Sequence, residues 1–133
     1  MPGQSIRVLV VDGKMERDDR IDEILAAAGF AIRVVNDSAS AVGVLEIWRP
    51  SVAIVDLRSP SSEAMQFCAD LARSRAAADL PVVFVGEGPN LLKPRPVIAA
   101  GLVAVPVDPD QLVATVSRVT RGTADVERAP LTS

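Results

Sequence analysis

The chain has 133 residues, of which 49% are hydrophobic and 23% charged, so we expect one folded domain with its own core and no second domain. Its 14 Lys and Arg residues against 17 Asp and Glu residues give a formal net charge of -3, which provides no basic surface for direct binding of nucleic acid or anionic lipid. Histidine is absent, which excludes Ser-His and Cys-His nucleophile pairs, imidazole metal sites and a phosphodonor histidine.

Strand-like and helix-like segments alternate along the chain. Apolar, largely β-branched runs predict strands, and apolar residues spaced three and four apart predict amphipathic helices between them. In chain order, the predicted strands lie at 6–11, 31–35, 52–55, 82–85 and 102–105, and the clearest helical spacing lies at 21–28, 41–48, 64–71 and 112–119.

The spacing of these strands predicts a parallel sheet. The strands start about 20 to 30 residues apart, which leaves room for one crossover helix between consecutive parallel strands. The strands lack polar alternation, which indicates that helices cover both faces of the sheet. We therefore expect the α/β class: a three-layer α/β/α sandwich around a five-stranded parallel sheet of order 2-1-3-4-5.

Two segments depart from this pattern. Residues 86–96 contain three prolines where the fourth helix should lie, so we expect that helix to be short, late or missing, with 97–100 as its remaining candidate. Residues from about 122 onward lose the helical period. We therefore expect a domain at 1–121 and a polar tail or the start of a linker at 122–133.

The chain shows no sign of a membrane segment or a secretory leader. No run reaches the roughly 18 to 20 apolar residues that a membrane span requires, and the first residues form no basic leader with a cleavage site. The single cysteine, Cys68, can form no internal disulfide. These features lead us to expect a cytoplasmic protein without a membrane partner.

Two aspartates lie where a site is expected in such a sheet. Asp12 follows the first predicted strand and Asp56 the third, and the sheet order places both carboxyl ends at the switch point. Two converging carboxylates could hold a hard divalent cation, or one could act as a nucleophile. Each aspartate alone is equally compatible with ordinary turn and cap chemistry.

Other phosphate-binding sites fit the loops less well. The loop at 13–19 is acidic and has neither the glycine spacing of a dinucleotide fold nor a nucleotide P-loop. It also lacks the Ser and Thr cluster of a flavin phosphate site, and the chain has no tyrosine and one tryptophan to stack on a flavin ring. A flavodoxin-type electron carrier is therefore disfavoured.

Four segments resemble the receiver domain of bacterial response regulators. The strongest element is Asp56 followed four residues later by Pro60, and the order and spacing of all five strands support it over about residues 6 to 121. The segments are VLVVD at 8–12, SVAIVDLRSP at 51–60, LPVV at 80–83 and VPVDPDQL at 105–112. The resemblance implies a signalling domain that is not an enzyme acting on a free substrate.

The resemblance implies a partly retained magnesium and phosphorylation site. The phosphoacceptor aspartate of the family falls on Asp56, and the magnesium ligands fall on Asp12, Asp56 and the backbone carbonyl of Arg58. The second acid that the family carries after its first strand is replaced by Gly13. The resemblance therefore implies weakly bound Mg²⁺ or no cofactor, unless a flexible Glu16 or Glu87 supplies the missing ligand.

At three further positions, this chain carries a residue different from the one that the family normally has. The Ser or Thr that ends the fourth strand and binds the phosphoryl group is Gly86, and the lysine before the proline is Val105. The aromatic switch position falls on Leu102. The bond from Val105 to Pro106 matches a cis proline of the family, so we predict a cis peptide there.

These changes leave two hypotheses for function. The first is an atypical or pseudo-receiver that has reduced or lost aspartate phosphorylation and acts by protein-protein interaction, through the face formed by the fourth helix, the fifth strand and the last helix. The second is a working, magnesium-dependent receiver that a histidine kinase phosphorylates on Asp56. The kinase, the partner, the pathway, the oligomeric state and any following output domain do not follow from the sequence.

Overall fold

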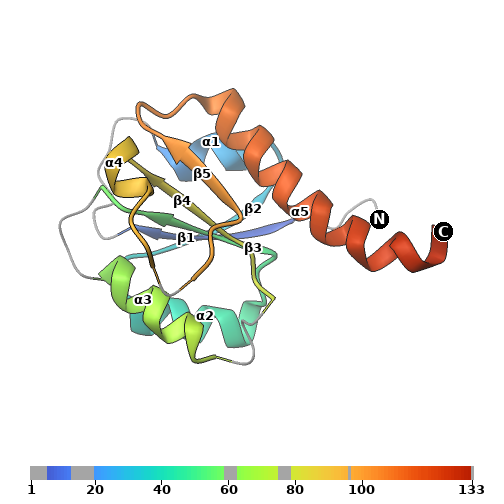
Figure 1. Cartoon of the computed structure of the whole chain (residues 1–133), viewed down its shortest axis with the longest axis horizontal. Helices are drawn as coiled ribbons and strands as arrows, with labels where there is room; N and C mark the ends of the chain where they lie inside the picture. The colour runs from blue at the N-terminus through green and yellow to red at the C-terminus, as the bar shows by residue number, and fades with distance from the viewer. Residues whose placement is uncertain (1–5, 13–19, 59–62, 75–78, 96, 133) are drawn as a thin grey trace.

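The computed structural model describes residues 6–12, 20–58, 63–74, 79–95 and 97–132, with the backbone alone for residue 12 and for 121–132. Five parallel strands form one sheet of order β2-β1-β3-β4-β5, as predicted (Figure 1). The strands span Arg7–Asp12 (β1), Ala31–Val35 (β2), Val52–Asp56 (β3), Val82–Gly86 (β4) and Gly101–Ala104 (β5).

In the part of the chain that the structure describes, five helices flank the sheet and complete the three predicted layers. They span Ile21–Ala27 (α1), Ser38–Trp48 (α2), Glu63–Ala72 (α3), Gly88–Leu91 (α4) and Pro109–Thr132 (α5). Helices α1 and α5 cover one face and α2 and α3 the other, while α4 lies near the ends of β4 and β5 (Figure 1). Within the described residues, no helix combines the length and the apolar character needed to cross a bilayer.

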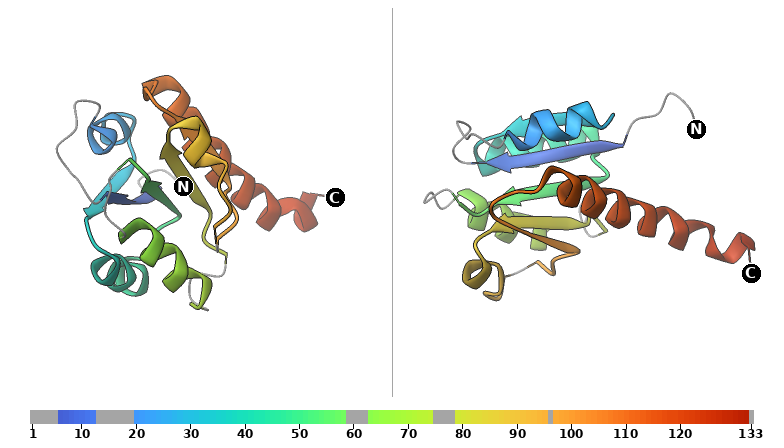
Figure 2. Two further views of the ribbon diagram at one scale, coloured as in Figure 1. Left: turned by 60° about the vertical axis from the view of Figure 1, so that its left-hand side comes forward. Right: turned by 90° about the horizontal axis from the view of Figure 1, so that it is seen from above.

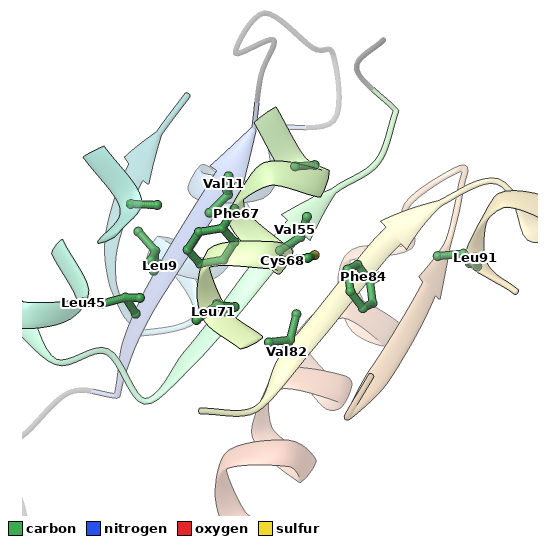
Figure 3. Close-up of a cluster of buried hydrophobic side chains, with 13 residues drawn as sticks. Leu9, Val11, Leu45, Val55, Phe67, Cys68, Leu71, Val82, Phe84 and Leu91 are labelled. Atoms are coloured by element: carbon green, nitrogen blue, oxygen red, sulfur yellow. The ribbon is translucent and has the colours of Figure 1, made fainter. Parts of the chain in front are cut away.

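The core is divided by the sheet into two apolar clusters, because successive side chains of a strand point to opposite faces. The cluster beneath α2 and α3 contains Phe67 and Cys68 of α3, which lie over the strands, and Phe84 of β4 (Figure 3). Burial raises the pKa of the Cys68 thiol. The opposite cluster joins α1 and α5 through Leu25, Leu112 and neighbouring residues. The central strands β3 and β4 are fully buried, as their continuous apolar sequences predict.

The fourth helix is short, as predicted, but its predicted position at 97–100 is wrong. It forms one turn directly after β4, at Gly88–Leu91, because Pro89 occupies its first turn, where a missing N–H is harmless. Residues 97–100 are not helical. Strand β5 also begins one residue earlier than expected, at Gly101.

Arg95 fixes the irregular segment that replaces the rest of the fourth helix. Its Nη2 donates to the backbone carbonyl of Asn90 at 2.6 Å and its Nη1 to the carbonyl of Lys93 at 2.9 Å. Its guanidinium carbon lies 5.1 Å from the ring centre of Phe84. Arg95 therefore satisfies a backbone carbonyl at the end of α4. It also makes a cation-π contact with Phe84 of β4.

The last helix is longer than the sequence analysis indicates. It continues without a break through 122–132, the segment expected to be a tail or linker start, and its end projects beyond the sheet (Figure 2). Where α5 crosses β5, the backbone approaches closely: a Cβ added at Gly101 would lie 2.8 Å from Thr115 Cγ2. That segment 122–133 serves as a tail or a linker stays a prediction.

Candidate functional site

The carboxyl ends of the neighbouring strands β1 and β3 bring the predicted aspartates together. Asp12 ends β1 and Asp56 ends β3, and the two residues are direct partners in the parallel ladder. They therefore lie at the switch point between β1 and β3, as the sequence predicts. The side chain of Asp12 lies outside the described part of the chain, as do Gly13, Glu16 and Pro60.

The carboxylate of Asp56 is completely buried and is held by Arg58. The backbone N–H of Arg58 donates to Oδ1 at 2.9 Å, which is the two-residue turn that aspartates favour after a strand. The guanidinium then folds back onto the same carboxylate. Its Nε lies 3.0 Å from Oδ1 and 3.2 Å from Oδ2, and its Nη2 lies 2.7 Å from Oδ2.

This pair is a charge-assisted contact in a water-poor environment. The side chain of Arg58 is 15% exposed and that of Asp56 is 0% exposed. A planar guanidinium matches both oxygens of a carboxylate, whereas a lysine ammonium provides only a point charge. Removal of one member of such a buried pair typically costs about 3 to 5 kcal/mol, because the remaining charge stays buried without compensation.

The end of β4 provides no hydroxyl, and its space is filled. A Cβ added at Gly86 would lie 3.3 Å from the Cβ of Leu57 and 3.6 Å from Cδ2 of Leu91. Leu57 itself is fixed, because its N–H donates to the carbonyl of Val85 at 2.7 Å. The Nδ2 of Asn90 also lies 3.5 Å from the carbonyl of Leu57. A side chain at this position would therefore require Leu57 to shift by a few tenths of an ångström.

The position after β5 faces the apolar core. Val105 is half-buried and packs against the cluster beneath α1 and α5. Its N–H donates to the carbonyl of Gly86 at 3.1 Å, which places it beside the end of β4. The predicted cis bond between Val105 and Pro106 is confirmed. Leu102, at the predicted aromatic switch position, is exposed on β5.

The four described positions therefore gather at one edge of the sheet. The ladders and loop hydrogen bonds join Asp12 to Asp56, and Gly86 to Val105. Glu87, the described candidate for a replacement ligand, is exposed at the N-cap of α4. Its role as a ligand stays a prediction, as does that of Glu16.

The side chain of Arg58 belongs to the site, which the sequence pattern did not predict. The resemblance implies a role only for its backbone carbonyl, whereas in the structure the guanidinium binds Asp56. A signal was available in the sequence: an arginine two residues after a strand-ending aspartate lies in a turn that can return its side chain to the carboxylate.

The described residues do not fit a magnesium ion in this arrangement. Mg²⁺ requires oxygen ligands in near-octahedral geometry at about 2.0 to 2.1 Å. Both oxygens of Asp56 already accept hydrogen bonds from Arg58, and the guanidinium brings a positive charge to the place where a cation would bind. Arg58 would have to leave before Asp56 could bind a metal ion.

Comparison with known proteins supports the receiver resemblance. No family model matches the chain. It is 27% identical to Protein Rrf1 of Nitratidesulfovibrio vulgaris over 133 residues, covering 93% of this chain and 94% of that protein. It is 24% identical over 119 residues to the phosphate regulon transcriptional regulatory protein PhoB of Pseudomonas aeruginosa, covering 87% of this chain and 52% of PhoB. The chain thus spans about half the length of PhoB.

The solved structures agree on the fold. The chemotaxis response regulator CheY4 of Vibrio cholerae superposes with a TM-score of 0.73 at 22% identity, over 87% of this chain and 99% of CheY4. This likeness establishes the fold.

Proposed function

We propose that this chain, which has the fold of the receiver domains of response regulators, is an atypical receiver that signals by binding a protein partner and has reduced or lost aspartate phosphorylation. One observation carries the proposal: the carboxylate at the phosphoacceptor position, Asp56, is buried and closed by the side chain of Arg58. A carboxylate that already binds a guanidinium on both oxygens is a poor nucleophile toward a phosphodonor.

The remaining machinery for phosphoryl transfer is also weakened. Transfer to a carboxylate brings negative charges together, so catalysis depends on the cations that neutralise them. Gly13 and Val105 replace an acidic ligand and a lysine, and each lost charged contact is worth about 1.5 to 3 kcal/mol. The rate of acyl-phosphate formation should therefore fall by orders of magnitude.

The loss of the switch hydroxyl supports the same conclusion. In the proposal, Gly86 offers no group that could bind a phosphoryl oxygen and transmit its presence to β5. Leu57 and Leu91 hold the space that a new side chain would need. Any phosphorylation of Asp56 would then be poorly coupled to the rest of the domain.

The proposed partner surface is the face formed by α4, β5 and α5. Two large apolar side chains of the segment after α4 are exposed, Leu92 at 78% and Ile98 at 92%, and Leu102 of β5 is exposed at 41%. Large apolar side chains exposed on a surface are a feature of protein interaction sites, and these three come from the segment between α4 and the end of β5. In this proposal the domain is a cytoplasmic, non-enzymatic signalling module whose partner is a protein.

The first test is phosphorylation itself. The intact mass of the wild-type chain is measured after incubation with acetyl phosphate and Mg²⁺, beside Asp56→Asn, with circular dichroism to show that both are folded. We expect no adduct or only a trace in the wild type, because Arg58 closes Asp56 and two neutralising contacts are missing.

The opposite result would favour the second hypothesis. A stoichiometric adduct in the wild type that is absent from Asp56→Asn would show that the chemistry survives, and the chain would then be a working receiver for a histidine kinase. An adduct in both proteins would locate the modification elsewhere, and would leave the proposed loss at Asp56 standing.

A further inference from the structure

The pair between Asp56 and Arg58 has a consequence for metal binding. The resemblance to receiver domains implies weakly bound Mg²⁺ or no cofactor beside Asp56, and among the described residues the guanidinium of Arg58 is a cation bound to that carboxylate. Three hydrogen bonds from the Arg58 side chain and one from its backbone reach the carboxylate.

We propose that Arg58 is the resident cation of this site, taking the place of the divalent metal, so that the native chain does not bind Mg²⁺ at Asp56. This inference deepens the proposed function and rests on it for the assignment of the site. Metal binding is prevented mainly because the guanidinium of Arg58 occupies the carboxylate of Asp56. The glycine at position 13, where an acid could have been a ligand, is a second cause.

The geometry indicates that Arg58 replaces a metal ion at Asp56 and leaves no room for both. Oδ1 accepts from the backbone N–H, Oδ2 accepts from Nη2, and the single N–H of Nε is shared between both oxygens, so each oxygen already has a donor from Arg58. A divalent ion at either oxygen would lie within a few ångströms of the guanidinium. Like charges at such distances in a buried environment repel strongly.

The burial supports replacement as well. A fully buried carboxylate needs a compensating cation, since an isolated buried charge is very costly. An internal arginine provides this compensation at every metal concentration, whereas a bound ion provides it only above its dissociation constant. The fold of this site should therefore be independent of divalent metal.

The backbone still has the arrangement that a cation site requires. Asp12 and Asp56 end neighbouring strands as direct ladder partners. Removal of the guanidinium would take its side-chain hydrogen bonds away from both oxygens of Asp56, whose partner in the β1–β3 ladder is a second acid. We expect Arg58→Ala to create a weak metal site, with a dissociation constant of about 1 mM or below, in the range of weak oxygen-ligand sites.

The test is a Mn²⁺ titration followed by electron paramagnetic resonance, in which bound Mn²⁺ loses the signal of the free ion. We expect the wild type to bind no Mn²⁺ up to several millimolar, and Arg58→Ala to bind one ion at least tenfold more tightly. The double variant Arg58→Ala with Asp56→Asn should again bind none. Arg73→Ala is the matched control, because Arg73 pairs with Asp70 at 2.7 Å on the exposed surface of α3, and it should behave as the wild type.

Two results would overturn the inference. One is Mn²⁺ binding by the wild type that Asp56→Asn abolishes, and the other is a folded Arg58→Ala that binds no ion. If Arg58→Ala does not fold, Arg58→Gln takes its place with the same two outcomes, since glutamine is neutral but can still donate to Asp56.

The inference and the proposed function can fail separately. Metal binding by the wild type without any acetyl-phosphate adduct would overturn the resident-cation role of Arg58 and leave the atypical receiver standing. A full adduct on a wild type that binds no Mn²⁺ would overturn the atypical receiver and leave Arg58 as the cation of the site.

Discussion

At the scale of single residues, Arg58 and Gly86 determine the surroundings of Asp56. Arg58 brings a positive charge to the carboxylate, and Gly86 provides no hydroxyl at the end of β4. A side chain added at Gly86 would lie close to Leu57, whose N–H is bonded to the carbonyl of Val85 in β4. The two leucine contacts beside Gly86 therefore set the cost of adding a side chain there.

We expect Gly86→Ser to destabilise the protein by about 1 to 2 kcal/mol, because the new Cβ would lie 3.3 Å from the Cβ of Leu57 and the core resists added volume. The free energy of unfolding is measured with urea. Gly88→Ser is the matched control, since nothing lies within 4 Å of a Cβ at Gly88, and it should change stability by less than about 0.5 kcal/mol. Equal stability of Gly86→Ser and the wild type would contradict this account of the packing.

At the scale of elements, polar contacts join α2 to α3 beside the apolar core. The hydroxyl of Ser38, at the start of α2, donates to Asp70 Oδ2 of α3 at 2.6 Å, and its N–H donates to Glu63 Oε1 at 2.8 Å. The hydrogen bond from Ser38, together with a further bond from Gln66 and the charge of Arg73, lowers the pKa of the Asp70 carboxyl. The two helices are therefore connected through an ionised carboxylate.

This connection predicts a pH dependence of stability. A carboxyl whose pKa is lower in the folded than in the unfolded state adds stability above the unfolded pKa, and this contribution is lost as the pH falls through the folded pKa. We expect Ser38→Ala to lower the melting temperature at pH 7 and to flatten its decrease between about pH 5 and pH 2. Thermal melts across this range test it, with the exposed Ser40→Ala as the control. Parallel curves for wild type and Ser38→Ala would show that Ser38 does not lower the pKa of Asp70.

At the scale of the whole molecule, the shortened fourth helix changes the face beside β5. A single turn, Gly88–Leu91, is followed by an irregular segment that Arg95 fixes against Phe84. That segment presents Leu92 and Ile98 outward. The irregular segment that follows the short helix thus carries the exposed apolar side chains Leu92 and Ile98 of the proposed partner surface.

We expect Ile98→Glu to abolish retention of the protein partner on the tagged chain, since a charge would replace the most exposed large apolar side chain of the patch. The measurement compares wild type, Ile98→Glu and Ile47→Glu by affinity capture, with mass spectrometry to identify what each retains. Ile47 is the control because it is 88% exposed on α2, away from this face. A partner that Ile98→Glu retains and Ile47→Glu loses would place the surface on α2.

The sequence alone determined the class, the strand order and the position of the site. Continuous apolar strands with crossover-length spacing have few alternatives to a doubly covered parallel sheet, and such a sheet brings Asp12 and Asp56 to one edge. Local rules also predicted that the fourth helix is short, because prolines disrupt the helical turn in which they lie. They did not predict that this helix lies directly after β4 or that α5 extends to residue 132.

Only the tertiary structure decided what surrounds Asp56. The return of the Arg58 guanidinium to the carboxylate depends on burial, which makes an uncompensated charge costly, and burial is a property of the packed molecule. The close packing beside Gly86 depends in the same way on Leu57, which follows β3 and is distant in sequence, and on Leu91 of α4. The pattern of residues could thus locate the pair of aspartates, while packing determined which group binds the carboxylate of Asp56.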